Sequence, residues 1–219
     1  MGALLIADRV VSEARISVPL VGVWQADLIV NGADQLSGQQ TLTTGSGAKW
    51  TGTVKRPGAF IGSSHLRLVG GAGGMGKTAK PQGYTSPTVR QVLNDLLAAA
   101  GESLASDAQA SLINTTIESW AILARQVLLQ LKALLQTVAP AGTIYQIQPG
   151  GALWVGTPAW GTSALKDYAI THEDPQMGRL EVGSDYPDLL PGTVLEDRRI
   201  SYVEHTISDT KTRTVAMYE

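Results

Sequence analysis

The sequence predicts a β-dominated α+β fold in which two antiparallel, β-barrel-like lobes are joined by two helices. Short apolar–polar alternations separated by glycine, typical of half-buried strands, occupy residues 4–69 and return after residue 140. Two stretches between them carry apolar residues at helical spacing. Closely spaced strands without intervening helices favour antiparallel meanders or a small barrel over parallel βαβ units. We therefore expect a first β lobe over residues 1–85, a helical segment over 86–140 and a second β lobe over 141–219.

The strand pattern of the first lobe is clearest in residues 23–30. Trp24, Ala26, Leu28 and Val30 share one face there, and the polar residues between them point to the other. The following Asn-Gly pair is a turn signal, because both residues tolerate positive φ. The same alternation recurs in residues 41–43, 49–55 and 65–69.

The first helix is expected over residues 87–100. Ser86 can cap its N-terminus, Pro87 suits the first helical position and Gly101 can end it. The apolar residues between these signals follow the i, i+3, i+4, i+7 rule: Val89, Val92, Leu93, Leu96, Leu97 and Ala100.

A second, longer helix is expected over residues 115–138, where most apolar residues fall on one broad face. Ile122 and Leu129 break this order, because both project from the middle of the polar face. Two interpretations remain open. Scattered exposed apolar residues are ordinary in soluble proteins; alternatively, Ile122 and Leu129 contact a second lobe or a neighbouring subunit.

The second lobe is predicted from the strand-like segments that follow Pro140. Turn sequences rich in glycine, proline, serine and aspartate separate them. The segments are residues 143–148, 152–155, 167–170, 179–182, 194–207 and 211–218.

Composition excludes several classes of function. The 219 residues include 17 basic and 19 acidic ones, and a formal net charge of -2 gives no broad electrostatic footprint for nucleic acid. The absence of cysteine removes disulfides and thiolate metal sites, so a reducing cytoplasm is the simplest place of synthesis. The most apolar window, residues 121–139, contains Arg125 and Lys132, which are costly in a bilayer. We expect no membrane span and no targeting signal.

Residues 71–78 match the phosphate-binding pattern G-x-x-x-x-G-K-[ST]. Its fixed positions are Gly71, Gly76, Lys77 and Thr78. In a nucleotide-binding protein, a helix begins at the Gly-Lys-Thr and directs N–H groups at the phosphates. The alternative function is therefore a P-loop nucleotide-binding enzyme that uses this loop.

The residues after the loop argue against that enzyme. Pro81 and Gly83 disfavour a helix directly after Thr78, so both are expected outside any helix. We therefore interpret the loop as a glycine hinge between the first lobe and the first helix. Lys77 becomes a surface cation, and we predict no bound cofactor.

Other candidates for chemistry are few. The three histidines, none with a second histidine at ligand spacing, are His65, His172 and His205. Four carboxylates could attract a cation but fit no calcium loop: Asp185, Asp188, Glu196 and Asp197. No G-x-S-x-G elbow activates a serine. We predict neither a catalytic residue nor a metal site.

Several stretches resemble tail hub proteins of bacteriophages. They are residues 69–77 (VGGAGGMGK), 88–102 (TVRQVLNDLLAAAGE), 145–156 (YQIQPGGALWVG) and 199–205 (RISYVEH), together with Trp120 and its helix. The resemblance implies a non-enzymatic structural protein with two tail-tube-like lobes. A homotrimer would present six lobes to a sixfold tail tube and a threefold face to the spike. Full hubs of contractile tails are longer, so it also implies a reduced version with a separate spike protein.

The resemblance also implies partners and a location. The partners would be other copies of the chain, the tail tube or distal tail protein, the spike or tip protein and the tape-measure protein, with nucleic acid only as the passing genome. The location would be the virion, at the tail tip or baseplate, after synthesis in the cytoplasm of a host bacterium. Besides the nucleotide-binding enzyme, a soluble β-rich binding module remains possible.

Overall fold

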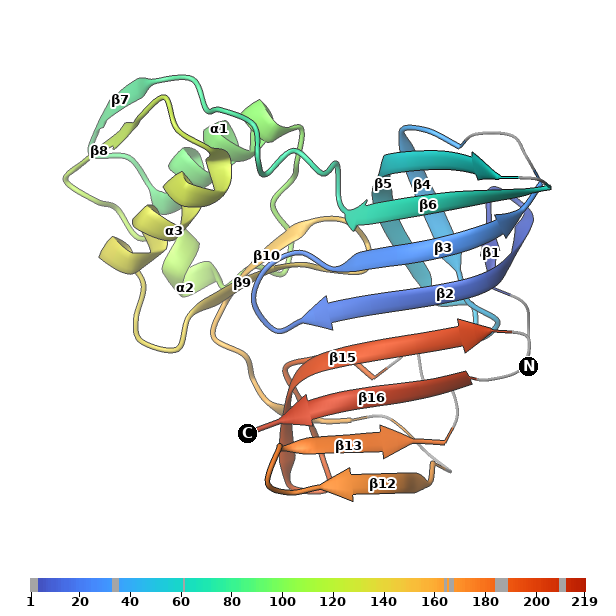
Figure 1. The fold of residues 1–219 in the computed structure, drawn as a ribbon. Helices are drawn as coiled ribbons and strands as arrows, with labels where there is room; N and C mark the ends of the chain where they lie inside the picture. Colours follow the sequence, from blue (N-terminus) through green and yellow to red (C-terminus); the bar gives the residue numbers. More distant parts are fainter. Residues whose placement is uncertain are drawn as a thin grey trace.

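Six strands of the N-terminal part close into a barrel. The computed structural model describes residues 4–32, 36–60, 62–163, 165, 168–183, 189–208 and 212–219. Around the barrel the strand order is β1-β4-β5-β6-β3-β2, and an additional antiparallel pairing of β1 with β2 closes it (Figure 1). The bounds are β1 Leu5–Ile6, β2 Arg9–Pro19, β3 Gln25–Asn31, β4 Gln39–Thr43, β5 Lys49–Phe60 and β6 Ser63–Gly70. The predicted antiparallel, barrel-like first lobe is confirmed.

Two tryptophans pack against each other in the core of this barrel. Trp24 and Trp50 meet edge to face with ring centroids 5.4 Å apart, and each is only 1% exposed. Gly70 leaves room for the Trp24 ring, because a Cβ atom at this position would lie 2.5 Å from the indole Nε1. Gly70 therefore serves close packing rather than flexibility.

The second lobe is joined to the barrel by direct strand pairing. Strand β15 runs antiparallel to β2, from Tyr202 opposite Pro19 to Ser208 opposite Glu13. Both lobes thus belong to one 12-stranded sheet, in which the order continues β2-β15-β16-β13-β12, with β14 on β15 and β11 on β14. The bounds are β11 Gly161–Thr162, β12 Ile170–Asp174, β13 Arg179–Val182, β14 Thr193–Leu195, β15 Arg198–Ser208 and β16 Thr212–Tyr218. The helices intervene between the lobes along the chain, whereas in space the lobes meet through β2 and β15.

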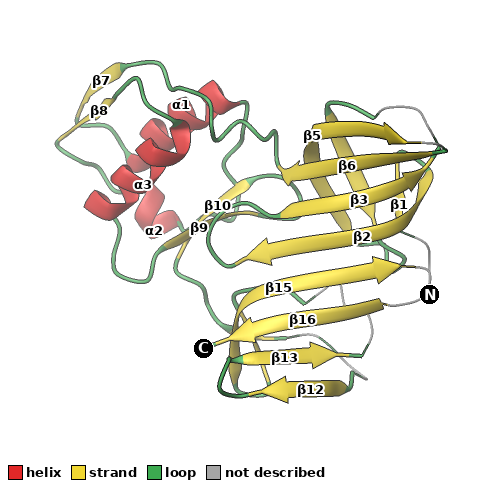
Figure 2. Cartoon of the chain, viewed as in Figure 1, coloured by secondary structure: helices red, strands yellow, loops and turns green. Residues whose placement is uncertain are grey.

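The second lobe has a core of its own, while the helical segment shares the core of the barrel. The second core comprises Leu180, Val182, Leu189, Leu195, Ile200, Val203 and Ala216. The helices lie beyond one end of the strands (Figure 2). The elements of this region are β7 Gln82–Thr85, α1 Val89–Ala100, α2 Ala110–Ile113, β8 Ser119–Ile122, α3 Val127–Val138, β9 Ile144–Ile147 and β10 Leu153–Gly156. The β9–β10 hairpin forms a sheet of its own and packs into the barrel core through Tyr145, Ile147, Leu153 and Val155. Its two strands were expected in the second lobe, over residues 141–219, and that assignment is wrong for them.

The first predicted helix is confirmed with one correction at its start. Helix α1 ends at Gly101 with φ 78, the left-handed conformation that glycine adopts easily. Its N-cap is Thr88, whose side chain accepts a hydrogen bond from the backbone N–H of Gln91. Ser86 was the expected cap, but it has φ 50 and lies outside the helix. The buried residues of α1 are the six apolar positions of the predicted face.

The second predicted helix is wrong over its first half. Only residues 127–138 are helical, whereas Ser119–Ile122 forms strand β8, paired with β7. The β-branched residues Thr115, Thr116 and Ile117 favour extended backbone, and β7 offers hydrogen bonds that a helix would forgo. None of the helices in the described part of the chain is long and apolar enough to span a membrane.

Candidate functional site

The glycine loop after β6 binds a carboxylate of its own chain. The backbone N–H groups of Ala72 and Gly74 donate to Glu102 Oε2 and Oε1 at 2.8 and 2.9 Å. Gly71 and Gly73 have φ values of 70 and 64, which turn the successive N–H groups toward the carboxylate. Glu102 is only 8% exposed. The N–H groups that a phosphate-binding loop would offer to a nucleotide are therefore used by Glu102.

The same loop holds the ends of two helices. Lys77 Nζ donates to the carbonyl of Ala100 at 3.2 Å, at the negative end of the α1 dipole. The carbonyls of Lys77 and Met75 accept from the N–H groups of Val127 and Leu128 at 2.9 Å each, in the first turn of α3. The loop is therefore not the hinge that the sequence suggested. It fixes the end of α1 and the start of α3 to the barrel.

The surroundings of the loop differ from those of a nucleotide site. Thr78 forms an isolated bridge with Gln126 instead of opening a helix. Pro81 lies in a coil and Gly83 in strand β7, so the prediction that both lie outside any helix is confirmed. Gly74 packs so tightly on α1 that a Cβ atom there would lie 1.8 Å from the Ala100 carbonyl oxygen.

The three histidines are far apart in the strand register and have different roles. His65 and His172 are exposed on β6 and β12. His205 of β15 is 1% exposed; its Nδ1 lies 2.9 Å from Thr214 Oγ1, and its ring centroid lies 6.3 Å from that of Trp50. In the described residues no group of three or more metal-ligating side chains comes together. Asp185 and Asp188 lie outside the described residues.

Ile122 and Leu129 do not share a helical face. Ile122 is 3% exposed in β8, where it belongs to the core, whereas Leu129 is 51% exposed on α3. The expectation of one shared surface depended on a continuous helix that does not exist. Contact of Leu129 with another subunit stays a prediction, and the nearby Leu123 is also 47% exposed.

Five charged residues and one threonine form a row across the exposed face of the shared sheet. Cross-strand register aligns Arg213 of β16, Thr206 of β15, Arg15 of β2, Asp27 of β3, Arg67 of β6 and Arg56 of β5. We call its four arginines the arginine row. The helices leave the face of β6, β3, β2, β15 and β16 uncovered (Figure 2). Strand alternation in the sequence indicated that Asp27 points outward, but it could not reveal the register that aligns the row.

Carboxylates pair with three members of the arginine row. Arg15 lies 2.8 Å from Glu204, Arg67 lies 2.7 Å from Asp27 and Arg213 lies 3.5 Å from Glu181. The hydrogen bond from the Arg67 guanidinium lowers the pKa of Asp27. Arg56 has no carboxylate partner among the described residues, and it lines a shallow groove of about 580 Å³ with Arg15 and Arg67.

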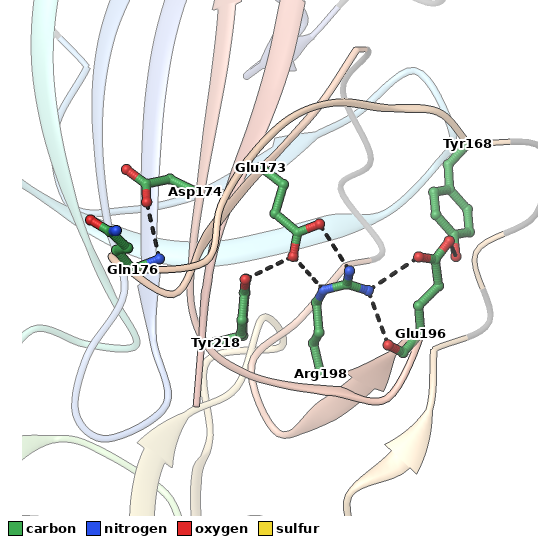
Figure 3. A network of polar contacts seen from close by, with 7 residues as sticks. All are labelled: Tyr168, Glu173, Asp174, Gln176, Glu196, Arg198 and Tyr218. Carbon is green, nitrogen blue, oxygen red and sulfur yellow. Dashed lines mark hydrogen bonds and ion pairs between the residues drawn. The ribbon is translucent and has the colours of Figure 1, made fainter.

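A second polar network lies beside the core of the second lobe (Figure 3). Arg198 donates to both oxygens of Glu173 at 2.8 and 2.9 Å and to Glu196 at 3.2 Å. Tyr218 O–H donates to Glu173 at 2.8 Å, and Tyr168 O–H donates to Glu196 at 2.9 Å. The hydrogen bonds from Arg198 and then Tyr218 lower the pKa of Glu173. The carboxylates are thus neutralised within the chain, and the network ties β12, β15 and β16 together.

Known proteins match the chain in structure. No protein-family model matches it, and neither does any curated protein sequence. A tail protein of prophage MuSo2 from Shewanella oneidensis superimposes with a TM-score of 0.71 at 11% identity, covering 99% of this chain and 96% of that one. The chain has the fold of phage tail proteins. A tail protein from Neisseria meningitidis MC58 gives a TM-score of 0.63 at 16% identity, with 100% and 97% covered.

The same fold occurs outside phages. The Escherichia coli c3393 protein is a component of the type VI secretion system with structural similarity to the T4 bacteriophage tail proteins gp27 and gp5. It matches with a TM-score of 0.64 at 11% identity, over 99% of this chain and 76% of that one. The resemblance noted in the glycine loop, α1 and the β9–β10 hairpin is therefore confirmed at the level of the fold.

Proposed function

We propose that the chain is a non-enzymatic structural protein of a phage tail, namely a hub at the distal end of the tail. Three copies form a ring that adapts the sixfold tail tube to the threefold spike or tip. The observation that carries the proposal is the direct pairing of β2 with β15, which sets two β lobes side by side in one sheet. The fold shared with phage tail proteins supports the same assignment.

The proposed ring follows from the number of lobes in each chain. Closed cyclic assembly is the usual arrangement of structural homo-oligomers, and three copies with two lobes each match a sixfold partner. The partners are further copies of the chain, the tail tube or distal tail protein, the spike or tip protein and the tape-measure protein. The location is the tail tip or baseplate of the virion.

Leu129 and Leu123 are the proposed subunit contacts outside the sheet. Both are large apolar residues close to half exposed, and they lie at the start of α3 and just before it. Burying them against another copy would remove this apolar surface from water. Ile122, already in the core, takes no part in this contact.

The glycine loop favours the structural role over the nucleotide-binding alternative. Its N–H groups at Ala72 and Gly74 already bind Glu102, and Lys77 binds the end of α1. We therefore expect neither the wild-type chain nor Lys77→Ala to bind ATP with Mg²⁺ in calorimetry. Saturable binding that depends on Lys77 would favour the enzyme instead.

The hub is tested on particles and on the purified chain. A label on the chain should appear with threefold symmetry at the tail tip in electron micrographs of intact tails. The purified chain should form a trimer by mass measurement, alone or with the tube or spike protein, and Leu129→Asp should weaken it. A chain located along the tube or in the head, or a strict monomer with every partner present, would contradict the proposal.

A further inference from the structure

We propose that opposite charges on the two ends of the shared sheet order the copies of this chain head to tail. Cationic side chains on β5 of one copy face the acidic second lobe of the next copy, beside β12. This inference rests on the proposed function, to which it adds the two surfaces that meet and the force that selects them. The apolar contact through Leu123 and Leu129 is separate from it.

The first of these surfaces is cationic. Residues 35–94 contain seven basic residues and neither aspartate nor glutamate. Three of the seven, Lys49, Lys55 and Arg56, are exposed along β5. None of these three belongs to an ion pair among the described residues. Arg56 even stands opposite Arg67, and such a like-charged pair disfavours the sheet. The positive charge of β5 is therefore a cost to the isolated chain, which carboxylates of a neighbouring copy would remove.

The second lobe has the opposite charge. Residues 157–219 contain eleven acidic and six basic residues. Asp174 ends β12 and Asp197 lies exposed in the turn before β15, and neither belongs to an ion pair among the described residues. Each follows a carboxylate of the network in Figure 3, where Arg198 joins Glu173 to Glu196. The two aspartates therefore add negative charge in the same part of the lobe.

The cationic and the acidic surface lie at opposite ends of one sheet (Figure 1). The strand order between them is β5-β6-β3-β2-β15-β16-β13-β12. Among the described strands, β12 pairs only with β13, and from Arg56 onward β5 pairs only with β6. An open strand edge can approach another chain. Each copy thus presents a cationic end to one neighbour and an acidic end to the other, as a head-to-tail contact in a closed ring requires.

The charges select this order more than they add affinity. Exposed ion pairs contribute little energy each, but complementary potentials speed association and like charges disfavour the wrong partner surface. Two cationic ends, or two acidic ends, would repel each other. The arrangement therefore favours a ring over a symmetric dimer built on either end. It also makes the ring sensitive to salt, because the Debye length falls from about 10 Å at 0.1 M to about 3 Å at 1 M.

The test reverses the charges of each end and measures self-association by sedimentation velocity. One variant carries Lys55→Glu and Arg56→Glu, and a second carries Asp174→Lys and Asp197→Lys. Each should weaken the trimer roughly tenfold or more, because like charges then meet. A third variant combines all four substitutions and keeps the net charge of the wild type. It should recover most of the lost association, since opposite charges face each other again. Raising the salt from about 0.1 M to about 1 M should weaken the wild-type trimer.

A matched control separates these surfaces from net charge. Lys80→Glu with Arg90→Glu changes the net charge as the β5 variant does, at exposed residues outside β5, and should leave the trimer intact. Thermal unfolding shows whether each variant is folded. If the lysine substitutions unfold the second lobe, Asp174→Asn with Asp197→Asn, which suits both turns, should still weaken the trimer.

The outcomes distinguish this inference from the proposed ring. A wild-type trimer that ignores salt, a control that weakens it as much as the β5 variant does, or a folded combined variant that stays dissociated would overturn the charge-ordered contact and leave the ring standing. A wild-type chain that forms no trimer with any partner would instead count against the hub.

Discussion

At the scale of single residues, Glu102 occupies the N–H groups that a letter-for-letter phosphate-loop match would offer to a phosphate. A loop of successive N–H groups attracts any anion, including a carboxylate of the same chain. Glu102 follows Gly101, the residue that ends α1, so the end of the helix delivers the carboxylate to the loop. Pro81 and Gly83 correctly predicted that no helix begins directly after Thr78. The sequence could not predict Glu102 as the anion, because the two segments meet only through tertiary packing.

Replacing Glu102 by Gln should destabilise the chain by about 1–3 kcal/mol. The amide has one acceptor oxygen, so its NH₂ group would face one of the N–H donors of Ala72 and Gly74, which would lose its partner in a buried place. Urea denaturation of the wild type and Glu102→Gln measures the difference. Glu118→Gln, which makes the same change at an exposed residue, should leave the unfolding midpoint unchanged. Equal midpoints for Glu102→Gln and the wild type would contradict this role.

Glu173 should make the second lobe sensitive to acid. Its pKa in the folded chain is lowered by Arg198 and Tyr218, below the value of about 4.3 that an unfolded chain has. Its contribution to stability is therefore complete above that value and is lost as the pH falls through the lower, folded pKa. Thermal unfolding between about pH 7 and pH 3 should show a fall in Tm that is smaller in Glu173→Gln. Parallel curves for the two proteins would show that Glu173 has no such effect.

At the scale of elements, prediction succeeded where local signals act alone. Helix α1 has a complete apolar face and a glycine end, and both were read correctly from residues 87–101. The stretch from Thr115 to Ile122 satisfied the same helical spacing but became an irregular segment and strand β8. Its partner β7 lies far away in sequence, so the competing hydrogen bonds could not be foreseen. Apolar spacing over a few residues fits a buried strand as well as a helix.

The true start of α1 can be checked with a pair of substitutions. Thr88→Ala removes the side-chain oxygen that accepts from the Gln91 N–H, which should cost about 1 kcal/mol. Ser86→Gly should cost nothing or be slightly favourable, because glycine adopts its positive φ without strain. Chemical denaturation of both variants measures the two effects. The reverse ranking would restore Ser86 as the cap.

At the scale of the whole molecule, the shared sheet makes the two lobes interdependent. The sequence predicted two β lobes, but their pairing through β2 and β15 joins segments nearly two hundred residues apart and depends on register that no local pattern contains. His205 of β15 lies buried near Trp50 of the barrel. The contact between the lobes is thus part of the first core rather than a loose surface.

This interdependence predicts one unfolding transition for both lobes. Leu68 in the barrel and Leu180 in the second lobe are each 0% exposed, so Leu68→Ala and Leu180→Ala should each cost about 2–5 kcal/mol. Because unfolding either lobe would strip β2 or β15 of its partner strand, each variant should lower one common Tm in calorimetry, with calorimetric and van't Hoff enthalpies equal. Independent lobes would instead give two transitions, of which each variant shifts only one. The proposed ring depends on the β2–β15 pairing in every copy, so it requires a single common transition. If the second lobe unfolded alone, β2 would lose its partner strand β15 in each copy.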